Sequence, residues 1–357
     1  MKITFIVPST SISGGVRVIF EYANRLQKRG HNVSVLYPLI PLNFGLRSYD
    51  YRRNFLRIVK FLSNFKRWAR VDWFDVKANL MIIPTLSEKY IPNSDIIVAT
   101  AWPTAYYVNS YGKCKGRKVY FIQGYEIWNG PRDKVEKTYK LPLRKVVVSS
   151  WLKNLMEDKF QERVKEVIMN GVNLDQFYNL HKKYNSKKRI LMYYSNSKLK
   201  GAEDGIKALE IVKNRYPEIQ LVMFGTRKGC NVPRYVKFHR KPSKERLREL
   251  YSSCDIFLYP SRSEGFGLPP MEAMACKCAV VTTNVGAIPD YVIPGKTALV
   301  SPPNNSKGLA ENLIQLIEDE EKLRNITIAG CNYIKRFGWE QSATKLEKLF
   351  KNLRVNN

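Results

Sequence analysis

The sequence has no pair of cysteines in a Cys-x-x-Cys spacing, and its three histidines stand far from one another. The six cysteines are scattered over a long chain, so they match neither the disulfide framework of a small secreted domain nor a zinc site. This pattern predicts a protein of a reducing compartment. It also argues against the clusters of histidine and cysteine that hold transition metals.

Long apolar runs are missing as well. No uninterrupted stretch approaches the ~18 residues that a membrane-spanning helix needs. The apolar run in the opening MKITFIVPST is too short for the hydrophobic region of a signal sequence, and no small-residue cleavage site is present, so we interpret it as a first strand. With 44% hydrophobic and 25% charged residues, the composition is that of a globular protein, and 357 residues suffice for two domains with a core each.

Acidic residues are scarce relative to basic ones. The chain has 60 Lys and Arg against 31 Asp and Glu, a formal net charge of +29. A field of this sign attracts polyanions such as nucleic acid, anionic lipid headgroups or phosphorylated substrates, without choosing among them. A nucleic-acid-binding protein is therefore one alternative, although the sequence has no RNP, helix-turn-helix or finger pattern.

Short β-rich runs alternate with amphipathic segments along most of the chain. In the first half we expect strands at Ile3–Val7, Val33–Tyr37, Ile96–Ala99, Val119–Ile122, Val146–Val148 and Val167–Met169, and a helix at Val16–Arg29. In the second half we expect strands at Ile190–Tyr194, Leu221–Phe224, Tyr235–His239, Ile256–Tyr259 and Ala279–Thr283, with helices at Glu203–Arg215, Ser243–Ser253 and Met271–Cys276. This alternation predicts two doubly wound α/β domains, joined by the polar linker Asn173–Arg189, with ligands bound in a cleft facing the carboxyl ends of the strands.

The most specific motif follows the strand expected at Ile256–Tyr259. It reads PSRSEGFGLPPMEAMA and places two carboxylates, Glu264 and Glu272, at an E-x7-E spacing. Pro269 and Pro270 suit the first turn of a helix, where missing amide donors cost little. Glu264 is therefore expected on the loop after the strand and Glu272 on the following helix.

The same motif offers backbone groups to a ligand. Gly265 and Gly267 permit a close approach of the chain, and the amides near Gly267 and Leu268 at a helix N-terminus form an anion site. Carboxylates accept from hydroxyls and amides donate to phosphate. Together they match a nucleotide sugar, although an E-x7-E spacing alone is more often a plain strand, turn and helix.

The motif resembles the signature of the retaining glycosyltransferases of family 4, which have the GT-B fold of two facing Rossmann-like domains with a cleft between them. Four further motifs match in order along essentially the whole chain, more weakly before residue 150: Ser13-Gly14-Gly15, Asn170-Gly171-Val172, Lys200-Gly201 and Phe337-Gly338-Trp339-Glu340. The resemblance implies an acceptor-binding domain at 1–172 and a nucleotide-sugar-binding domain at 173–335. It also implies a C-terminal helix, 336–357, that packs back on the first domain.

The resemblance also assigns roles to residues of this chain. It implies that Glu264 contacts the transferred sugar, that Glu272 accepts from the ribose hydroxyls and that Lys200 binds the diphosphate. The remaining donor contacts that it implies are Gly14, Gly15, Arg240, Lys241, Gly265, Phe266, Gly267 and Leu268.

Two departures from the family pattern concern the reacting groups. Ser195 occupies the position of an arginine that helps to clamp the diphosphate, and Lys198 or Arg262 are candidates to replace it. Gln123 falls where the family often has a histidine, and a glutamine cannot act as a general base. A front-face retaining mechanism tolerates this, because the leaving phosphate takes the acceptor proton. Gln123 and Glu126 are candidate acceptor contacts, with a solvated loop glutamate as an equal alternative for Glu126.

Motifs for metals and cofactors are missing. No two aspartates are separated by one residue, so the Asp-x-Asp that holds a cation in other glycosyltransferases is lacking. The sequence also has no Gly-x-Gly-x-x-Gly and no Walker pattern. We therefore predict metal-independent transfer with no cofactor besides the nucleotide-sugar donor, whose base and sugar no motif reveals.

Residues 42–70 form a basic and aromatic segment. They hold eight Lys and Arg, one acidic residue, and apolar side chains at helical spacings. This suits a helix lying in the interface of an anionic membrane, with an ordinary core-facing helix as the alternative. The prediction is an enzyme at the cytoplasmic membrane face that glycosylates a glycan or lipid-linked acceptor. A GT-B epimerase or phosphorylase and a catalytically silent relative are further alternatives.

Overall fold

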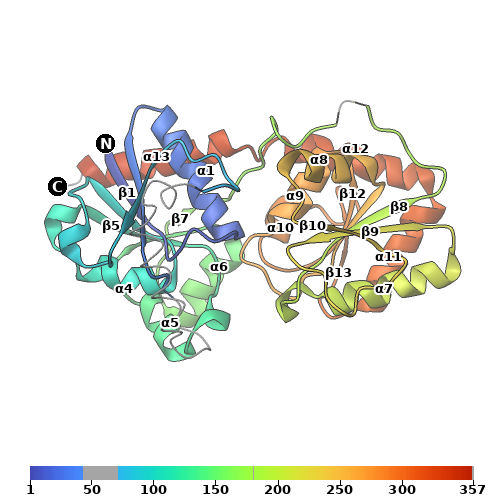
Figure 1. Cartoon of the computed structure of the whole chain (residues 1–357), viewed down its shortest axis with the longest axis horizontal. Helices are drawn as coiled ribbons and strands as arrows, with labels where there is room; N and C mark the ends of the chain where they lie inside the picture. Colours follow the sequence, from blue (N-terminus) through green and yellow to red (C-terminus); the bar gives the residue numbers. More distant parts are fainter. Residues whose placement is uncertain (43–70, 180, 356–357) are drawn as a thin grey trace, which may run out of the picture. The chain divides into compact units, whose positions relative to one another are not determined.

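The computed structural model describes residues 1–42, 71–179 and 181–355. It divides into two compact units (Figure 1): unit 1 comprises residues 1–169 and 339–357, and unit 2 comprises residues 170–338. The chain crosses between the units at Met169/Asn170 and at Gly338/Trp339, each three residues from an expected domain boundary. Each unit is described by itself.

Unit 1 is built on a parallel sheet of seven strands. Their order is β3-β2-β1-β4-β5-β6-β7, and every pairing within the sheet is parallel. The strands are β1 (Lys2–Ile6), β2 (Asn32–Pro38), β3 (Asn79–Ile83), β4 (Ile96–Ala99), β5 (Arg117–Ile122), β6 (Arg144–Val147) and β7 (Glu166–Val167). The central strands β1 and β4 are buried on both faces, which explains their continuous apolar sequences.

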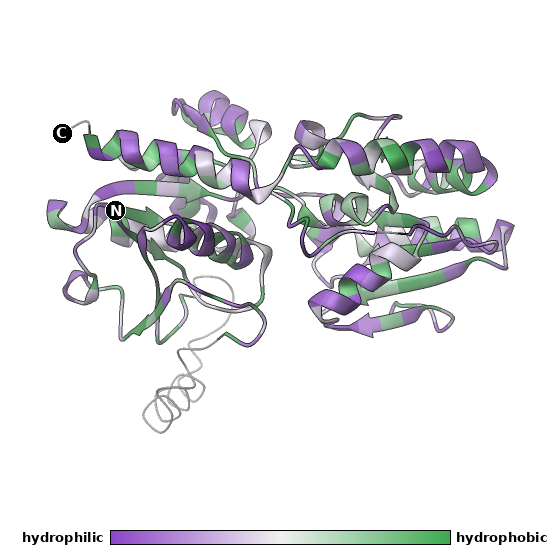
Figure 2. Ribbon diagram, turned by 90° about the horizontal axis from the view of Figure 1, so that it is seen from above, coloured by the Kyte–Doolittle hydropathy of each residue, from purple (hydrophilic) through white to green (hydrophobic). Residues whose placement is uncertain are grey.

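Helices accompany this sheet and connect its strands. They are α1 (Gly14–Lys28), α4 (Trp102–Ser110), α5 (Arg132–Tyr139), α6 (Ser150–Asn154) and the C-terminal α13 (Trp339–Val355). Helix α13 packs against α1, and Arg29, the residue directly after α1, forms ion pairs with Glu340 at 2.8 Å and Glu347 at 2.9 Å. Its ribbon carries both hydrophilic and hydrophobic colours in Figure 2, as expected for a helix with one buried face.

Unit 2 repeats the plan with six parallel strands in the order β10-β9-β8-β11-β12-β13. The strands are β8 (Arg189–Tyr193), β9 (Gln220–Gly225), β10 (Lys237–Arg240), β11 (Ile256–Tyr259), β12 (Ala279–Thr283) and β13 (Leu299–Ser301). The helices are α7 (Ala202–Arg215), α8 (Lys244–Ser253), α9 (Leu268–Ala275), α10 (Ile288–Tyr291), α11 (Ser306–Glu318) and α12 (Glu320–Ile334). One core cluster joins β8, β9, β11 and β12 to α7, α11 and α12.

The segment predicted as a linker, Asn173–Arg189, belongs instead to unit 2. Its polar side chains bond to the chain between α8 and β11 and after α9: Asn179 Nδ2 donates to the Cys276 carbonyl at 3.2 Å, and Asn185 Nδ2 donates to Asp255 Oδ2 at 2.8 Å. The polar composition of this segment therefore reflects a surface segment packed on unit 2, and not a linker between domains.

The basic aromatic segment predicted at 42–70 lies outside the described residues except for Leu42. Its membrane role stays a prediction. Among the helices that the structure describes, none is long and apolar enough to cross a bilayer.

Candidate functional site

The Glu264 carboxylate lies at the carboxyl edge of the unit 2 sheet, on the loop between β11 and α9. Its Oε1 accepts hydrogen bonds from Lys200 Nζ at 2.7 Å, from Ser261 Oγ at 2.7 Å and from the Tyr259 hydroxyl. The Glu264 side chain is 7% exposed, and its Oε2 accepts no hydrogen bond from the residues that the structure describes. One carboxylate oxygen is therefore fixed by protein groups and the other is left for a ligand.

Tyr259 supports this arrangement from the last position of β11. Burial, and then the neighbouring Glu264 carboxylate, raise the pKa of the Tyr259 hydroxyl well above its usual range. The phenol consequently stays protonated and donates to Glu264. Tyr259 was expected only as the end of a strand, and no pattern in the sequence marks it or Ser261 as a partner of Glu264.

Backbone packing holds the Glu264 loop against the turn that carries Lys200. Gly201 has φ +60°, and a Cβ placed there would lie 1.9 Å from the Pro260 carbonyl oxygen. The Leu199 carbonyl accepts from the Arg262 amide at 2.8 Å. Gly201 thus explains the Lys-Gly motif, because only a residue without a Cβ lets the turn with Lys200 approach the signature loop so closely.

Helix α9 begins directly after the signature glycines. Gly267 is its N-cap residue with φ +92°, and its carbonyl accepts from the Tyr291 hydroxyl. Phe266 is buried and stacks on the Tyr291 ring at 5.5 Å between centroids. Tyr291 therefore supports the turn that was predicted to present amides to a phosphate. Leu268, the first residue of α9, is partly exposed.

Glu272 lies on α9, as predicted, but it is only 3% exposed. The Tyr251 hydroxyl donates to Glu272 Oε2 at 3.2 Å. Its predicted contact with a ribose remains a prediction, and the structure shows that such a contact would use a carboxylate already bonded within unit 2.

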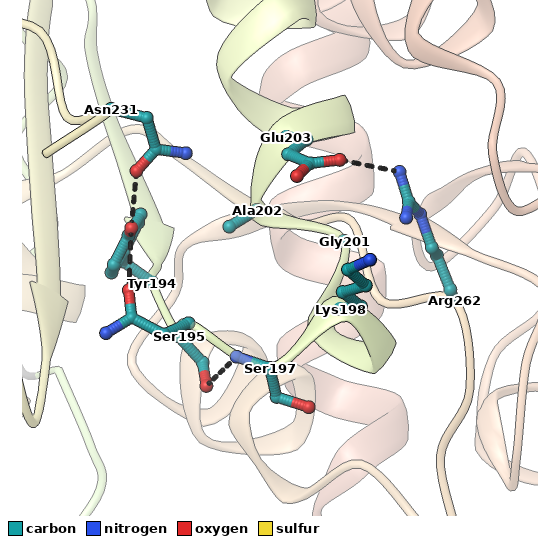
Figure 3. A pocket seen from close by; sticks show the side chains of 10 residues that line it. Tyr194, Ser195, Ser197, Lys198, Gly201, Ala202, Glu203, Asn231 and Arg262 are labelled. Carbon is teal, nitrogen blue, oxygen red and sulfur yellow. Dashed lines mark hydrogen bonds and ion pairs between the residues drawn. The ribbon is translucent and has the colours of Figure 1, made fainter. Parts of the chain in front are cut away.

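A pocket of about 120 Å³ opens beside the Lys200 turn (Figure 3). Most of the residues that line it have polar side chains, and they include Ser195, Ser197, Lys198 and Asn231. The Tyr194 hydroxyl contacts the side-chain oxygens of Asn196, at 2.9 Å, and Asn231. Ser195, which occupies the position of the family's arginine, is thus part of the wall of this pocket.

The two cations considered as replacements for that arginine differ in their surroundings. Arg262 is held by Asp204, with Nε to Oδ2 at 2.6 Å and Nη2 to Oδ1 at 2.8 Å, and lies 3.5 Å from Glu203 (Figure 3). Lys198 is exposed and forms no ion pair with any residue that the structure describes. The charge of Arg262 is therefore compensated within unit 2, and that of Lys198 is not.

Arg240 is the last residue of β10 and Lys241 follows it. Strand β10 lies two strands away from β8, and its carboxyl end is at the same edge of the sheet. Arg240 is exposed, and Lys241 has φ +45°, an uncommon conformation for a residue with a side chain. No bond links either residue to the Glu264 group within the described chain. They stay candidate contacts of a ligand that extends along this edge.

The candidate residues of unit 1 gather at the carboxyl ends of its central strands. Ser13 caps α1, its Oγ accepting from the Val16 amide at 3.2 Å, so Gly14 and Gly15 form the first turn. A Cβ on Gly15 would lie 3.3 Å from Gln123 Nε2, and none of its surroundings would obstruct one on Gly14. The glycine loop and Gln123, separated by more than a hundred residues in sequence, therefore meet.

Glu126 lies beside this group, at the N-terminus of α4. Its Oε2 accepts from the Trp102 amide at 2.7 Å, and its own amide donates to the Tyr139 hydroxyl at 3.2 Å. Burial raises the pKa of the Glu126 carboxyl to about 7, against the opposing effect of the Trp102 hydrogen bond. Glu126 is thus not a freely solvated loop residue.

Proteins of known sequence or structure resemble this chain. An uncharacterized glycosyltransferase of Methanocaldococcus jannaschii is 26% identical over 226 residues, 58% of this chain and 59% of the relative. The O-antigen chain mannosyltransferase B of Escherichia coli is 35% identical over 37% of this chain and 33% of the relative. The chain thus matches between about a third and three fifths of the length of these relatives.

A solved structure matches over nearly the full length. Anabaena HepE in complex with UDP and glucose superposes with a TM-score of 0.74 at 16% sequence identity, covering 99% of this chain and 100% of that one. Two family profiles also match, Glycosyltransferase Family 4 over residues 12–176 and Glycosyl transferases group 1 over residues 176–332. Between them they span most of the chain, which therefore belongs to the family 4, group 1 glycosyltransferases and has their GT-B fold.

Proposed function

We propose that this glycosyltransferase moves a hexose from a nucleotide-diphosphate sugar to a hydroxyl of a glycan or lipid-linked acceptor, with retention of configuration. The observation that carries the proposal is the Lys200–Glu264 pair at 2.7 Å, on a rigid loop at the edge where α/β folds bind ligands. A cation and a carboxylate so placed suit a leaving diphosphate and a sugar ring that become oppositely charged in the transition state.

In the proposed reaction the acceptor oxygen bonds to the anomeric carbon on the face from which the phosphate leaves. The bond between that carbon and the phosphate oxygen breaks, and the acceptor proton passes to the leaving phosphate. This route needs no protein base, which accommodates Gln123. Glu264 Oε2 accepts from a hydroxyl of the transferred sugar and stabilises the positive charge on the ring.

The diphosphate contacts follow from the charges of unit 2. Lys200 supplies one cation, and Lys198 supplies the second, because Arg262 is already paired with Asp204. The backbone at Gly265 to Leu268 approaches the donor, and Glu272 and Arg240 bind the nucleoside. The solved relative bound to UDP and glucose supports a uridine donor, although the mannosyltransferase of E. coli keeps other donors open.

The first prediction concerns donor binding. In a thermal-shift comparison of UDP, GDP, UDP-glucose and GDP-mannose, we expect one nucleotide family to stabilise the protein. Ligand at 100 times its dissociation constant adds about 2.7 kcal/mol to the unfolding free energy, several degrees for domains of this size. If saturating concentrations of every nucleotide and nucleotide sugar leave the transition unchanged, the proposal fails.

The second prediction concerns metal. Because no Asp-x-Asp is present, we expect transfer to proceed at an unchanged rate after dialysis against a chelator. The measurement is release of the nucleoside diphosphate in the presence of acceptor, with and without added manganese. Activity that disappears with chelator and returns with manganese would contradict metal independence.

The third prediction concerns the membrane. We propose that the basic segment 42–70 holds the enzyme at the anionic cytoplasmic face of a membrane. In liposome flotation the protein should rise with vesicles containing anionic lipid at low salt and dissociate at high salt. Equal behaviour with neutral and anionic vesicles would remove electrostatic membrane binding from the proposal.

A further inference from the structure

Three segments of unit 1, each a loop that in two cases runs into the first turn of the next helix, contain no lysine or arginine. They follow β1, β4 and β5 and comprise residues 7–15, 100–106 and 123–131, whose only charged side chain is Glu126. With 60 Lys and Arg among 357 residues, about four would be expected in these 25 positions. Since β1, β4 and β5 are neighbouring parallel strands, the three loops share one edge of the sheet. These three segments are therefore poor in charge in a strongly basic protein, although Lys159, from outside them, donates to the Tyr125 hydroxyl at 2.6 Å.

The same edge exposes large apolar side chains. Trp128 is 49% exposed and Ile12 is 53% exposed, on the loops after β5 and β1. The other tryptophans in the described chain are buried or partly buried. A Cβ on Gly130 would lie 2.4 Å from the ring of the buried Trp102, so the loop that carries Trp128 is folded tightly against α4. Its exposed indole is consequently presented by a fixed loop.

The same loop carries a carboxylate, that of Glu126, with one oxygen able to accept further hydrogen bonds. Glu126 is two residues before Trp128, and its Oε2 is bonded to the Trp102 amide. Its Oε1 accepts no hydrogen bond from the residues that the structure describes, although the carboxyl group is removed from water enough to raise its pKa to about 7. Burying an ionisable carboxyl group lowers the stability of the folded protein. A role of Glu126 in ligand binding would explain why the residue is present at this position.

We propose that these three loops bind a neutral sugar of the acceptor, with its C–H face against Trp128 and a hydroxyl donating to Glu126. The proposal rests on the function proposed above and adds the chemical class of the acceptor group. An exposed aromatic ring and a carboxylate with a free oxygen, carried by one short loop, suit a pyranose, which has an apolar face and hydroxyl edges. A phosphorylated group or an anionic membrane is bound by cations, and these three segments contain no lysine or arginine.

The test uses saturation-transfer NMR on the full chain with methyl α-glycosides of glucose, galactose, mannose and N-acetylglucosamine, and with glucose 6-phosphate as the anionic probe. At least one neutral glycoside should bind with a dissociation constant of about 1–10 mM, as isolated sugars do. Trp128→Ala should weaken this binding at least about tenfold, and Trp128→Tyr should restore part of it. Tyr90→Ala, which removes another exposed ring of unit 1, is the matched control and should bind as wild type.

Glu126→Gln keeps an oxygen for the Trp102 amide and should also weaken glycoside binding. Nucleotide binding by unit 2 is measured in parallel and should be the same in all variants, so loss of the donor site is distinguishable from loss of this one. The proposal is overturned if no neutral glycoside binds at about 50 mM, or if Trp128→Ala binds it normally. Tighter, Trp128-dependent binding of glucose 6-phosphate or of anionic vesicles would overturn it as well.

Discussion

Replacing Glu264 by glutamine is expected to lower kcat by about 100- to 1,000-fold, the range seen when a group that stabilises transition-state charge is removed. Glutamine keeps an oxygen that can accept from Lys200, Ser261 and Tyr259, whose hydrogen bonds hold the side chain. It loses the negative charge that would face the sugar ring. Lys200 is 29% exposed, so its ammonium group stays hydrated when its partner is neutral.

The measurement is steady-state release of the nucleoside diphosphate with saturating donor, together with the thermal shift that the donor produces. Glu311→Gln is the control, since it removes an exposed carboxylate from α11 of the same unit. A folded Glu264→Gln protein should bind donor and fail to turn it over. Turnover within about threefold of wild type would take Glu264 out of the reacting site, because so small an effect is below that of one lost hydrogen bond.

The sequence predicted the loop, the helix and the glycines of the signature, since these follow from local rules. Proline pairs mark a helix start, and the last residues of a buried strand lead into a loop at the ligand-binding edge. The resemblance to family 4 assigned Glu264 and Lys200, which are 64 residues apart, to the sugar and the diphosphate of one donor, and the structure places the two side chains 2.7 Å apart. Local pattern therefore located the loop, and the family pattern supplied its long-range partner.

The groups that hold the site were not predictable in the same way. Asp204 lies on the helix after the Lys200 turn and pairs with Arg262 across 58 positions of sequence. Nothing in its local sequence distinguishes it from Glu203, which is exposed and only 3.5 Å from the same guanidinium. Which carboxylate compensates Arg262 depends on how α7 is rotated against β11, and this rotation is set by tertiary packing.

Unit 1 shows another limit of sequence patterns. Helix α4 reads WPTAYYVNS, with aromatic residues on more than one side, so it lacks the 3.6-residue period that predicts an amphipathic helix. Its N-terminus is held by Thr104 Oγ1, which accepts from the amides of Thr100 and Ala101, and by Glu126 from a distant loop. The helix that positions the candidate acceptor edge thus depends on contacts that no local motif encodes.

Replacing Gly201 by alanine is expected to reduce both stability and transfer. A residue with a Cβ at φ +60° costs about 1–2 kcal/mol, and the Pro260 carbonyl oxygen, 1.9 Å from the new Cβ, forces a backbone shift that costs about 1–3 kcal/mol more. The unfolding free energy of unit 2 should therefore fall by about 2–5 kcal/mol. The shift moves Lys200 relative to Glu264, so transfer should fall even under conditions where the variant is fully folded.

Gly295→Ala separates these two causes. Gly295 lies in the same unit with φ +75°, but no atom outside its chain neighbours lies within 4 Å of the new Cβ. The substitution should lower the unfolding free energy by about 1–2 kcal/mol, the cost of the left-handed conformation, and leave transfer unchanged. Urea unfolding and steady-state transfer of the two variants give the comparison. The prediction is contradicted if both variants lose the same stability and both keep wild-type turnover. In that case the close approach of Gly201 to Pro260 does not hold the Lys200 turn against the Glu264 loop.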